Sequence, residues 1–168
     1  MASATVGARG GFSLLEVMVV VILIGILSAL AYSSLMELVF TNRAKETAQT
    51  MRTFVERALV EGKRQGKEVE IKIDGNNIQY TIDGNATPIS ESLSQGYSGG
   101  SASVPTGCTY VATGLKAEPR IGLSGVTTGC FVACGARDYC AAAMKTIDKN
   151  SFTAHIKRGT NATNWEAL

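Results

Sequence analysis

One acidic residue stands inside a long apolar run near the N-terminus of this chain. From Phe12 to Tyr32 the only charged side chain is that of Glu16. A helix needs about 20 consecutive apolar residues to cross the hydrocarbon core of a bilayer. A carboxylate placed in hydrocarbon costs a few kcal/mol, so it requires a positively charged partner. The apolar run offers no such partner close to Glu16.

A free α-amine would meet this requirement. If a leader were cut between Gly11 and Phe12, the new amine of Phe12 would stand at the edge of the apolar run. A second copy of the chain, shifted along the helix axis, would then pair its Phe12 amine with Glu16. This pairing would neutralise both charges and fix the axial offset between subunits. The alternative is an acid at the membrane interface that lipid headgroups solvate.

The four cysteines indicate an oxidising compartment. Cys108, Cys130, Cys134 and Cys140 are separated by 21, 3 and 5 residues. An even number of cysteines in one small exported domain predicts two disulfides. A zinc site would require paired short spacings and usually histidine ligands, whereas the only histidine, His155, lies farther along the chain. Four cysteines allow three pairings, and the sequence does not choose among them.

Composition argues against an enzyme and against a strong nucleic-acid binder. Only 18% of the residues are charged, and the formal net charge is +2, with acids and bases mixed along the chain. A nucleic-acid binder usually has a basic stripe. The chain has a single histidine and no glycine-rich phosphate loop after a strand, so no nucleophile and base can be paired. We therefore predict a structural protein without a metal or cofactor.

Apolar periodicity predicts one continuous helix from residue 12 to residue 61. Beyond Tyr32 the apolar run narrows to a stripe at spacings of three and four residues, which is one face of a helix. The helix would be about 75 Å long at 1.5 Å per residue, and Gly62 and Gly66 provide stop signals. The stripe consists of Tyr32, Met36, Phe40, Ala44, Ala48, Met51, Val55, Ala58 and Leu59.

After Gly66 the apolar period changes to two, which is typical of strands. Residues 69–73 and 78–82 alternate around Gly75-Asn76, and this predicts a β-hairpin whose apolar face covers the helix stripe. Residues 83–107 are rich in glycine and serine and predict a long loop. Further short strands are predicted at 108–112, 120–123, 129–133, 139–147 and 151–157, the last two as a hairpin. The fold class is α+β: a long N-terminal helix packed on an antiparallel sheet.

Arg9-Gly10-Gly11, followed by Phe12-Ser13-Leu14-Leu15-Glu16-Val17 and a long apolar run, resembles the N-terminus of type IV pilins and type II secretion pseudopilins. In that family a prepilin peptidase cuts after the glycine and methylates the new N-terminus. The resemblance implies that Gly11 precedes the cut, that Phe12 is methylated and that Glu16 sets the subunit register. Two departures are Ser33, where many members have proline, and Gly10, which leaves the basic charge at Arg9.

The resemblance also implies an organisation and a location. Residues 1–11 would be the leader, 12–33 the transmembrane and assembly half of the helix, 34–62 its amphipathic half, and 67–168 a β-rich head with disulfides. The chain would be a single-pass inner-membrane protein with a periplasmic head, and later part of a pilus or pseudopilus. Its partners would be other pilin or pseudopilin subunits, the prepilin peptidase, the inner-membrane assembly platform and the lipid bilayer.

A second, looser resemblance concerns Phe54–Ile71, which is similar to the GspH/FimT group of minor pilins and pseudopilins. It implies a low-abundance subunit that primes assembly or sits near the fibre tip. The alternative is a major pilin, or an adhesive or DNA-uptake pilin. Some members of the group bind DNA through a basic C-terminal motif. The nearest counterpart here is Lys157-Arg158, which a solvated strand end explains better than a DNA site.

Overall fold

The computed structural model describes residues 13–84, 87–100, 104–111, 114–119, 122–123, 129–145, 151–159 and 164–168. The chain divides into two compact units, Met1–Leu38 and Val39–Leu168. Helix α1, Leu14–Gln65, begins in the first unit and ends in the second. The predicted continuous helix is confirmed within these bounds. The predicted leader and Phe12 lie outside the described residues.

Helix α1 ends four residues later than the sequence predicted. Gly62 does not stop it; the helix ends at Gly66, whose φ of 66° lies in the left-handed region that glycine adopts without strain. The Gly66 amide donates to the carbonyl of Lys63, and the Lys67 amide donates to the carbonyl of Gly62. These two bonds satisfy carbonyls that the helix end would otherwise leave unpaired, as in a Schellman motif.

The part of α1 in the second unit buries one face. Buried positions recur every three or four residues, as expected for a helix that covers a core on one side. Three of them are alanines, so small side chains make up part of the buried face. The buried residues are Thr41, Ala44, Thr47, Ala48, Met51, Phe54, Val55, Ala58, Leu59 and Gly62.

The first sheet is antiparallel and has the order β3-β2-β1-β6-β7. The predicted hairpin is confirmed, because Ile73 lies opposite Ile78 and the chain turns at Gly75 and Asn76. Strand β6 was not predicted; it pairs with β1 on the side away from β2. The strands are β1 Val69–Asp74, β2 Asn77–Ile82, β3 Ile89–Ser92, β6 Leu115–Glu118 and β7 Gly122–Leu123.

The second sheet has the order β11-β10-β9-β8-β4, and β5 pairs with β8 in parallel. The predicted pairing of the strands near 139–147 and 151–157 is confirmed by the antiparallel β9–β10 ladder. A short 3-10 turn, η1 Ala136–Asp138, joins β8 to β9. The strands are β4 Ser98–Gly99, β5 Thr109–Tyr110, β8 Gly129–Cys134, β9 Cys140–Lys145, β10 Phe152–Lys157 and β11 Glu166–Ala167.

The prediction of a long loop at residues 83–107 was wrong. Strand β3 extends the first sheet and β4 extends the second. The Gly99 amide of β4 donates to the carbonyl of Gly75 at 2.9 Å, so this segment also ties the two sheets together. All four residues of β3 are exposed. An edge strand exposed on both faces lacks the apolar alternation that would reveal it.

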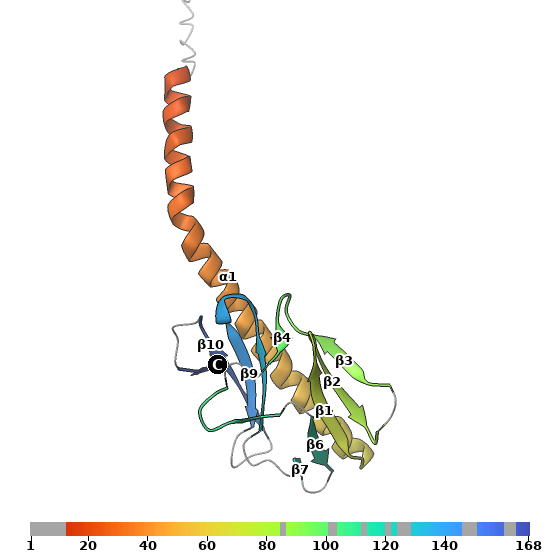
Figure 1. Ribbon diagram of the computed structural model, residues 1–168. Helices are drawn as coiled ribbons and strands as arrows, with labels where there is room; N and C mark the ends of the chain where they lie inside the picture. Colours follow the sequence, from red (N-terminus) through yellow and green to blue (C-terminus); the bar gives the residue numbers. More distant parts are fainter. Residues whose placement is uncertain are drawn as a thin grey trace, which may run out of the picture. The chain divides into compact units, whose positions relative to one another are not determined.

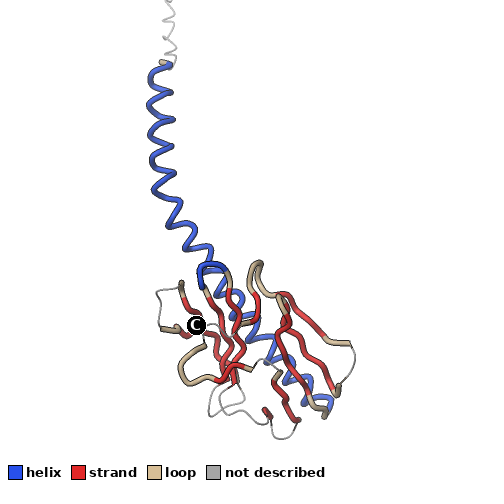
Figure 2. The backbone as a smooth tube through the Cα atoms, viewed as in Figure 1, coloured by secondary structure: helices blue, strands red, loops and turns tan. Residues whose placement is uncertain are grey.

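Both sheets contribute to one core against α1, and Figure 2 shows the C-terminal part of the helix behind both groups of strands. Strand β9 is central in the second sheet, between β10 and β8 (Figure 1). Strands β8 and β9 are both buried on both faces. Their side chains at Phe131, Ala133, Ala141 and Ala143 join the core that faces the helix. Cys130, Val132 and Ala142 form a second, smaller cluster on the opposite face.

The structure pairs the cysteines as Cys108–Cys130 and Cys134–Cys140. Two disulfides were predicted, and the pairing that the sequence left open is now specified. Cys134 lies directly opposite Cys140 in the β8–β9 ladder, so the second disulfide closes the short turn η1. Because Cys130 and Cys134 belong to the face of β8 away from the helix, the disulfides strengthen the side that α1 does not cover.

Gly62 generates a prediction about the stability of the head. A Cβ at this position would collide with Cγ2 of Val69 and would lie 3.2 Å from the carbonyl oxygen of Lys67. Alanine normally stabilises a helix by about 0.5–1 kcal/mol relative to glycine, but overpacking costs about 1–3 kcal/mol. We expect Gly62→Ala to lower the free energy of unfolding by about 1 kcal/mol in denaturant titrations of the full chain in micelles.

The matched control is Gly25→Ala. Gly25 lies in the same helix, and an added Cβ there meets nothing within 4 Å. This variant should leave the unfolding midpoint of the head unchanged. An increase in stability for Gly62→Ala would show that β1 does not approach the helix as closely as described.

Candidate functional site

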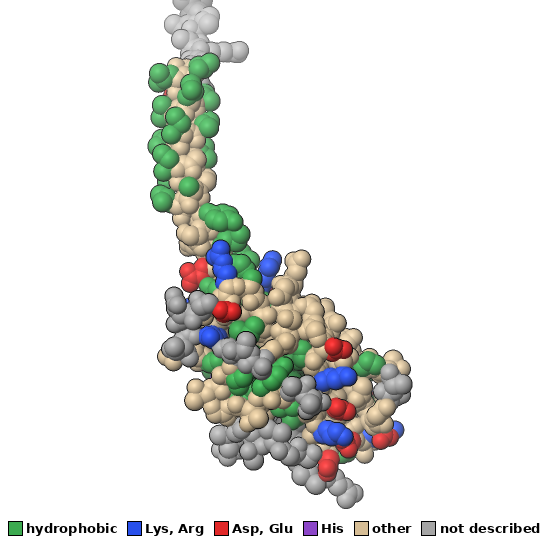
Figure 3. Space-filling model, in the orientation of Figure 1, with side chains coloured by type: hydrophobic (Ala, Val, Ile, Leu, Met, Phe, Trp, Pro, Cys, Tyr) green, Lys and Arg blue, Asp and Glu red, His purple; other side chains and the backbone are tan. Residues whose placement is uncertain are grey.

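The first unit presents an uncovered apolar surface. Every residue from Ser13 to Leu35 is exposed, including the large side chains of Leu14, Leu15, Met18, Ile22 and Leu30. An 18-residue window of this helix has a mean hydropathy of 2.8, and none of its residues is buried. In Figure 3 hydrophobic side chains project from both sides of the segment. By length and composition it can cross a membrane, and an exposed patch of this extent marks a membrane or protein contact.

The start of α1 is fixed by Ser13. Its side-chain oxygen accepts a hydrogen bond from the Leu15 amide at 3.3 Å, and its carbonyl accepts one from Val17 at 3.2 Å. Ser13 is therefore the N-cap, which satisfies amide groups that have no partner within the helix. Glu16 stands in the first turn, three residues after the cap. An acid there is favoured by the partial positive charge of the helix N-terminus.

Glu16 has a second possible structural role that the sequence reasoning did not weigh. Serine followed three residues later by glutamate is the capping-box pattern, in which the glutamate accepts from the N-cap amide. Within the described residues, the Glu16 carboxylate forms neither that bond nor an ion pair. Its charge thus has no partner among the described residues, and Glu16→Gln would separate the two roles.

The basic pair near the C-terminus is not gathered into a basic patch. The Arg158 guanidinium forms an ion pair with Glu166 at 2.8 Å, between the end of β10 and β11. Lys157 is half-buried at the last position of β10 and also has an interaction partner. An arginine held by a carboxylate is less available to a phosphate, so this geometry does not favour a DNA site.

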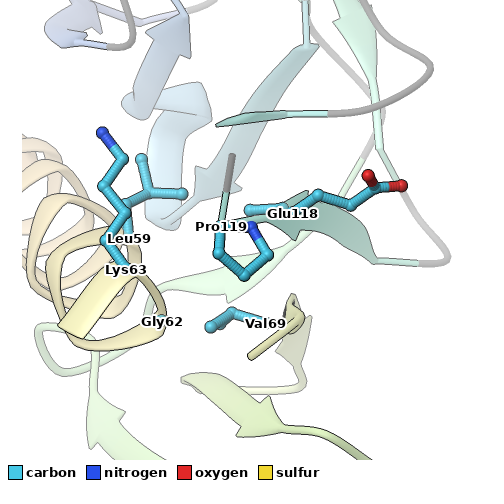
Figure 4. Close-up of a pocket in the computed structure, with 7 residues that line it drawn as sticks. Leu59, Gly62, Lys63, Val69, Glu118 and Pro119 are labelled. Carbon is cyan, nitrogen blue, oxygen red and sulfur yellow. The ribbon is translucent and has the colours of Figure 1, made fainter. Parts of the chain in front are cut away.

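A small cavity lies between the end of α1 and the first sheet (Figure 4). It is lined by Leu59, Gly62, Lys63, Val69, Ala117, Glu118 and Pro119. Its volume of about 10 Å³ holds roughly one water molecule. The side chains of Lys63 and Glu118 point away from one another in Figure 4. This cavity is a packing seam beside Gly62 and has no room for a ligand.

A depression on the first sheet is acidic but largely neutralised. Glu68, Glu70, Asp83 and Lys116 line it. Lys116 lies 3.2 Å from Glu68, and Lys67 lies 3.2 Å from Asp83. Among the described residues no group of three or more potential metal ligands is found.

A larger cavity of about 380 Å³ lies over the second sheet. Its lining comes from the segment before β5, from β9 and β10, and from the C-terminal residues. The lining residues are Pro105, Thr106, Met144, His155, Asn164 and Trp165. The sequence did not predict that His155 and Trp165 lie together, because their proximity depends on the pairing of β9, β10 and β11.

The comparisons with known proteins bear on the N-terminus. Residues 7–32 match the prokaryotic N-terminal methylation motif. The motif spans the predicted cut, Glu16 and most of the uncovered apolar segment. No curated protein and no solved structure matches the chain. The chain therefore carries a prepilin-type methylation motif on a pilin-like α+β fold, in which a long N-terminal helix packs on antiparallel sheets.

The environment of His155 predicts its protonation behaviour. Partial burial lowers the pKa of this imidazole from its ordinary value of 6.5. The folded state therefore binds fewer protons than the unfolded state just below pH 6.5, so the free energy of unfolding should fall as the pH drops through that range. Because His155 is the only histidine, the pH dependence of its ring proton resonances in NMR spectra measures the pKa directly.

The chain unfolded in urea provides the reference for that titration. A pKa in the folded protein equal to or above the unfolded value would contradict the burial described for this side chain.

Proposed function

We propose that this chain is a structural subunit of a type IV pilus or of a type II secretion pseudopilus. The observation that supports this most directly is an exposed, mainly apolar helical segment whose only charged residue is Glu16, which lies inside a methylation motif. The role requires no catalytic group: the chain contributes shape, apolar surface and one charge. The inner-membrane assembly platform and other pilin or pseudopilin subunits are its expected partners.

In this proposal the prepilin peptidase cuts between Gly11 and Phe12 and methylates the amine of Phe12. Both residues lie outside the described part of the chain, so the support is the motif match and the position of the N-cap. After such a cut only Phe12 precedes Ser13, which caps the helix. The new amine would therefore belong to the residue directly before the N-cap, next to the apolar surface.

Before assembly, the apolar segment would anchor the chain in the inner membrane, with the head in the periplasm. The two disulfides support a periplasmic head, because such bonds form in oxidising compartments. During assembly the same apolar surface would exchange lipid contacts for contacts with neighbouring helices. Both environments are apolar, so that exchange contributes little hydrophobic driving force. A specific polar contact then has a large effect on the register.

Glu16 supplies that contact in our proposal. Its carboxylate has no partner within the described chain, and hydrocarbon would make an unpaired charge costly. The Phe12 amine of a neighbouring copy, offset along the helix axis, would pair with it. Only one relative offset brings the two charges together, so the pairing selects a single subunit spacing.

The finer assignment to a minor subunit of the GspH/FimT type rests on Phe54–Ile71. This stretch contains the end of α1, the left-handed Gly66 and the beginning of β1. A major pilin or an adhesive pilin has the same general requirements and remains the alternative. The Arg158–Glu166 ion pair makes a DNA-uptake role the less favoured version.

Processing is tested by the mass of the membrane-extracted chain. We expect the mature protein to lack residues 1–11 and to carry one methyl group on Phe12. Gly11→Leu should accumulate as the uncut precursor, because a bulky side chain then precedes the scissile bond. Gly10→Leu is the matched control and should still be cut. A mature chain that begins at Met1, or beyond Ala31, would exclude this processing.

Charge pairing is tested by incorporation of Glu16 variants into sheared fibres or into pseudopili. Glu16→Gln keeps the shape and the ability to accept a capping-box hydrogen bond but removes the charge. We expect it to be cut and membrane-inserted, yet to enter fibres at least about tenfold less than the parent chain, as Glu16→Ala should. Glu37→Gln, an exposed acid farther along α1, should assemble normally. Normal assembly of Glu16→Gln alongside defective Glu16→Ala would favour the capping role instead.

A further inference from the structure

The cavity over the second sheet lies on a cluster of fully buried residues. Beneath it lie Cys130, Val132 and Ala142, which have no exposed surface. Met144 and Trp165 are half-buried and pack on this cluster. An aromatic ring held on one side by a packed cluster has limited freedom, so it can offer its remaining surface to a ligand without a large entropic cost. At about 380 Å³ the cavity lies in the size range of small-molecule sites.

The hydrogen bonds around His155 define which of its nitrogens is free. The Thr153 hydroxyl oxygen lies 3.3 Å from the Met144 carbonyl oxygen and 2.9 Å from His155 Nε2. Which of the hydroxyl and Nε2 donates depends on the tautomer of the ring. Among the described residues Nδ1 has no hydrogen-bond partner. The imidazole therefore offers Nδ1 to a hydroxyl or amide group of a ligand, as donor or as acceptor according to the tautomer.

The other lining groups are polar but carry no charge. Thr106 and Asn164 are exposed and provide a hydroxyl and an amide, each able to donate and accept. Trp165 adds an indole ring and Pro105 an apolar wall. None of the described lining residues has a carboxylate, ammonium or guanidinium group. Of the charged residues close in sequence to the lining, Arg158 and Glu166 pair with each other.

We propose that this cavity is a binding site for a neutral saccharide. A sugar ring has an apolar face of C–H groups, which suits an indole, and a rim of hydroxyls, which suits an imidazole nitrogen, an amide and a hydroxyl. A charged ligand would find no carboxylate, ammonium or guanidinium partner among the described lining residues and would lose hydration without compensation from them. The site is independent of the assembly surface on α1, so it would act whether or not the chain polymerises by the proposed pairing.

The chain contains a single tryptophan, so its fluorescence reports on this cavity alone. The full chain is studied in lauryldimethylamine oxide micelles, because sugar-based detergents would compete for the site. The probes are maltotetraose and the N-acetylglucosamine tetramer, and tetragalacturonate is the charged comparison. We expect a saturable change in Trp165 emission with one or both neutral probes, at a Kd of about 1 mM or tighter, and none with tetragalacturonate.

Variants of the two exposed residues avoid disturbing the fold. Asn164→Ala and Thr106→Ala should each weaken binding about threefold to tenfold, as expected for the loss of one hydrogen bond. Asn77→Ala, an exposed residue of β2 in the other sheet, should bind as the parent chain does. Isothermal titration calorimetry on Trp165→Phe provides a second readout, and its affinity should fall without loss of thermal stability.

Three results would overturn the proposal. The first is that neither neutral probe binds saturably at concentrations up to roughly 20 mM, about 20 times the expected Kd. The second is binding of tetragalacturonate as tight as that of the neutral probes. The third is neutral-probe binding that Asn164→Ala, Thr106→Ala and Trp165→Phe all leave unchanged, which would place the site elsewhere. Assembly of the fibre is not measured in this experiment, so its outcome is separate from the proposed function.

Discussion

The second half of α1 buries one face against both sheets, and the positions of the strands depend on that contact. Several small residues lie on this face: Ala44, Ala48 and Ala58 have no exposed surface. In the same core, Ala133, Ala141 and Ala143 of β8 and β9 are likewise fully buried. The helix and the second sheet therefore share one packed apolar core. The first half of the same helix has no such partner, so it must find an apolar environment elsewhere.

The second half of α1 packs on the sheets and the first half needs an apolar environment outside the head, so the two halves of one helix have different surfaces. Where lipid or neighbouring helices would surround it, the apolar residues occur on all sides. Where the strands cover only one side, exposed charges such as Arg52 and Glu56 pair on the other. The change from a surface that is apolar on all sides to one that is apolar on one side is set by the side chains, because the helix continues through Leu38 and Val39 without a break. Glu16 is exceptional because it is a charge placed in the all-apolar half.

The sequence allowed prediction of the elements with strong periodicity. Helix α1, the β1–β2 hairpin and the presence of two disulfides follow from local patterns. Strands β3, β4 and β11 did not, because they are short or exposed on both faces and lack an apolar period. Strand β6 alternates buried and less buried residues, but over only four positions, which is too short a period to stand out. The cysteine pairing depends on how β5, β8 and β9 align in the folded sheet, and local sequence patterns do not specify that alignment. The cavity at Trp165 was missed for the same reason: its walls come from residues about 60 positions apart, a separation over which periodicity carries no information.

The disulfide Cys108–Cys130 closes a loop that contains β6, a strand of the first sheet, whereas Cys130 itself belongs to β8 of the second. The two sheets are therefore joined by a covalent ring as well as by packing on the helix. A protease that nicks the chain between these cysteines would release no fragment, because both new ends stay attached through sulfur. In a harsh extracellular setting the head would thus survive single cuts that would dismantle an otherwise identical reduced protein.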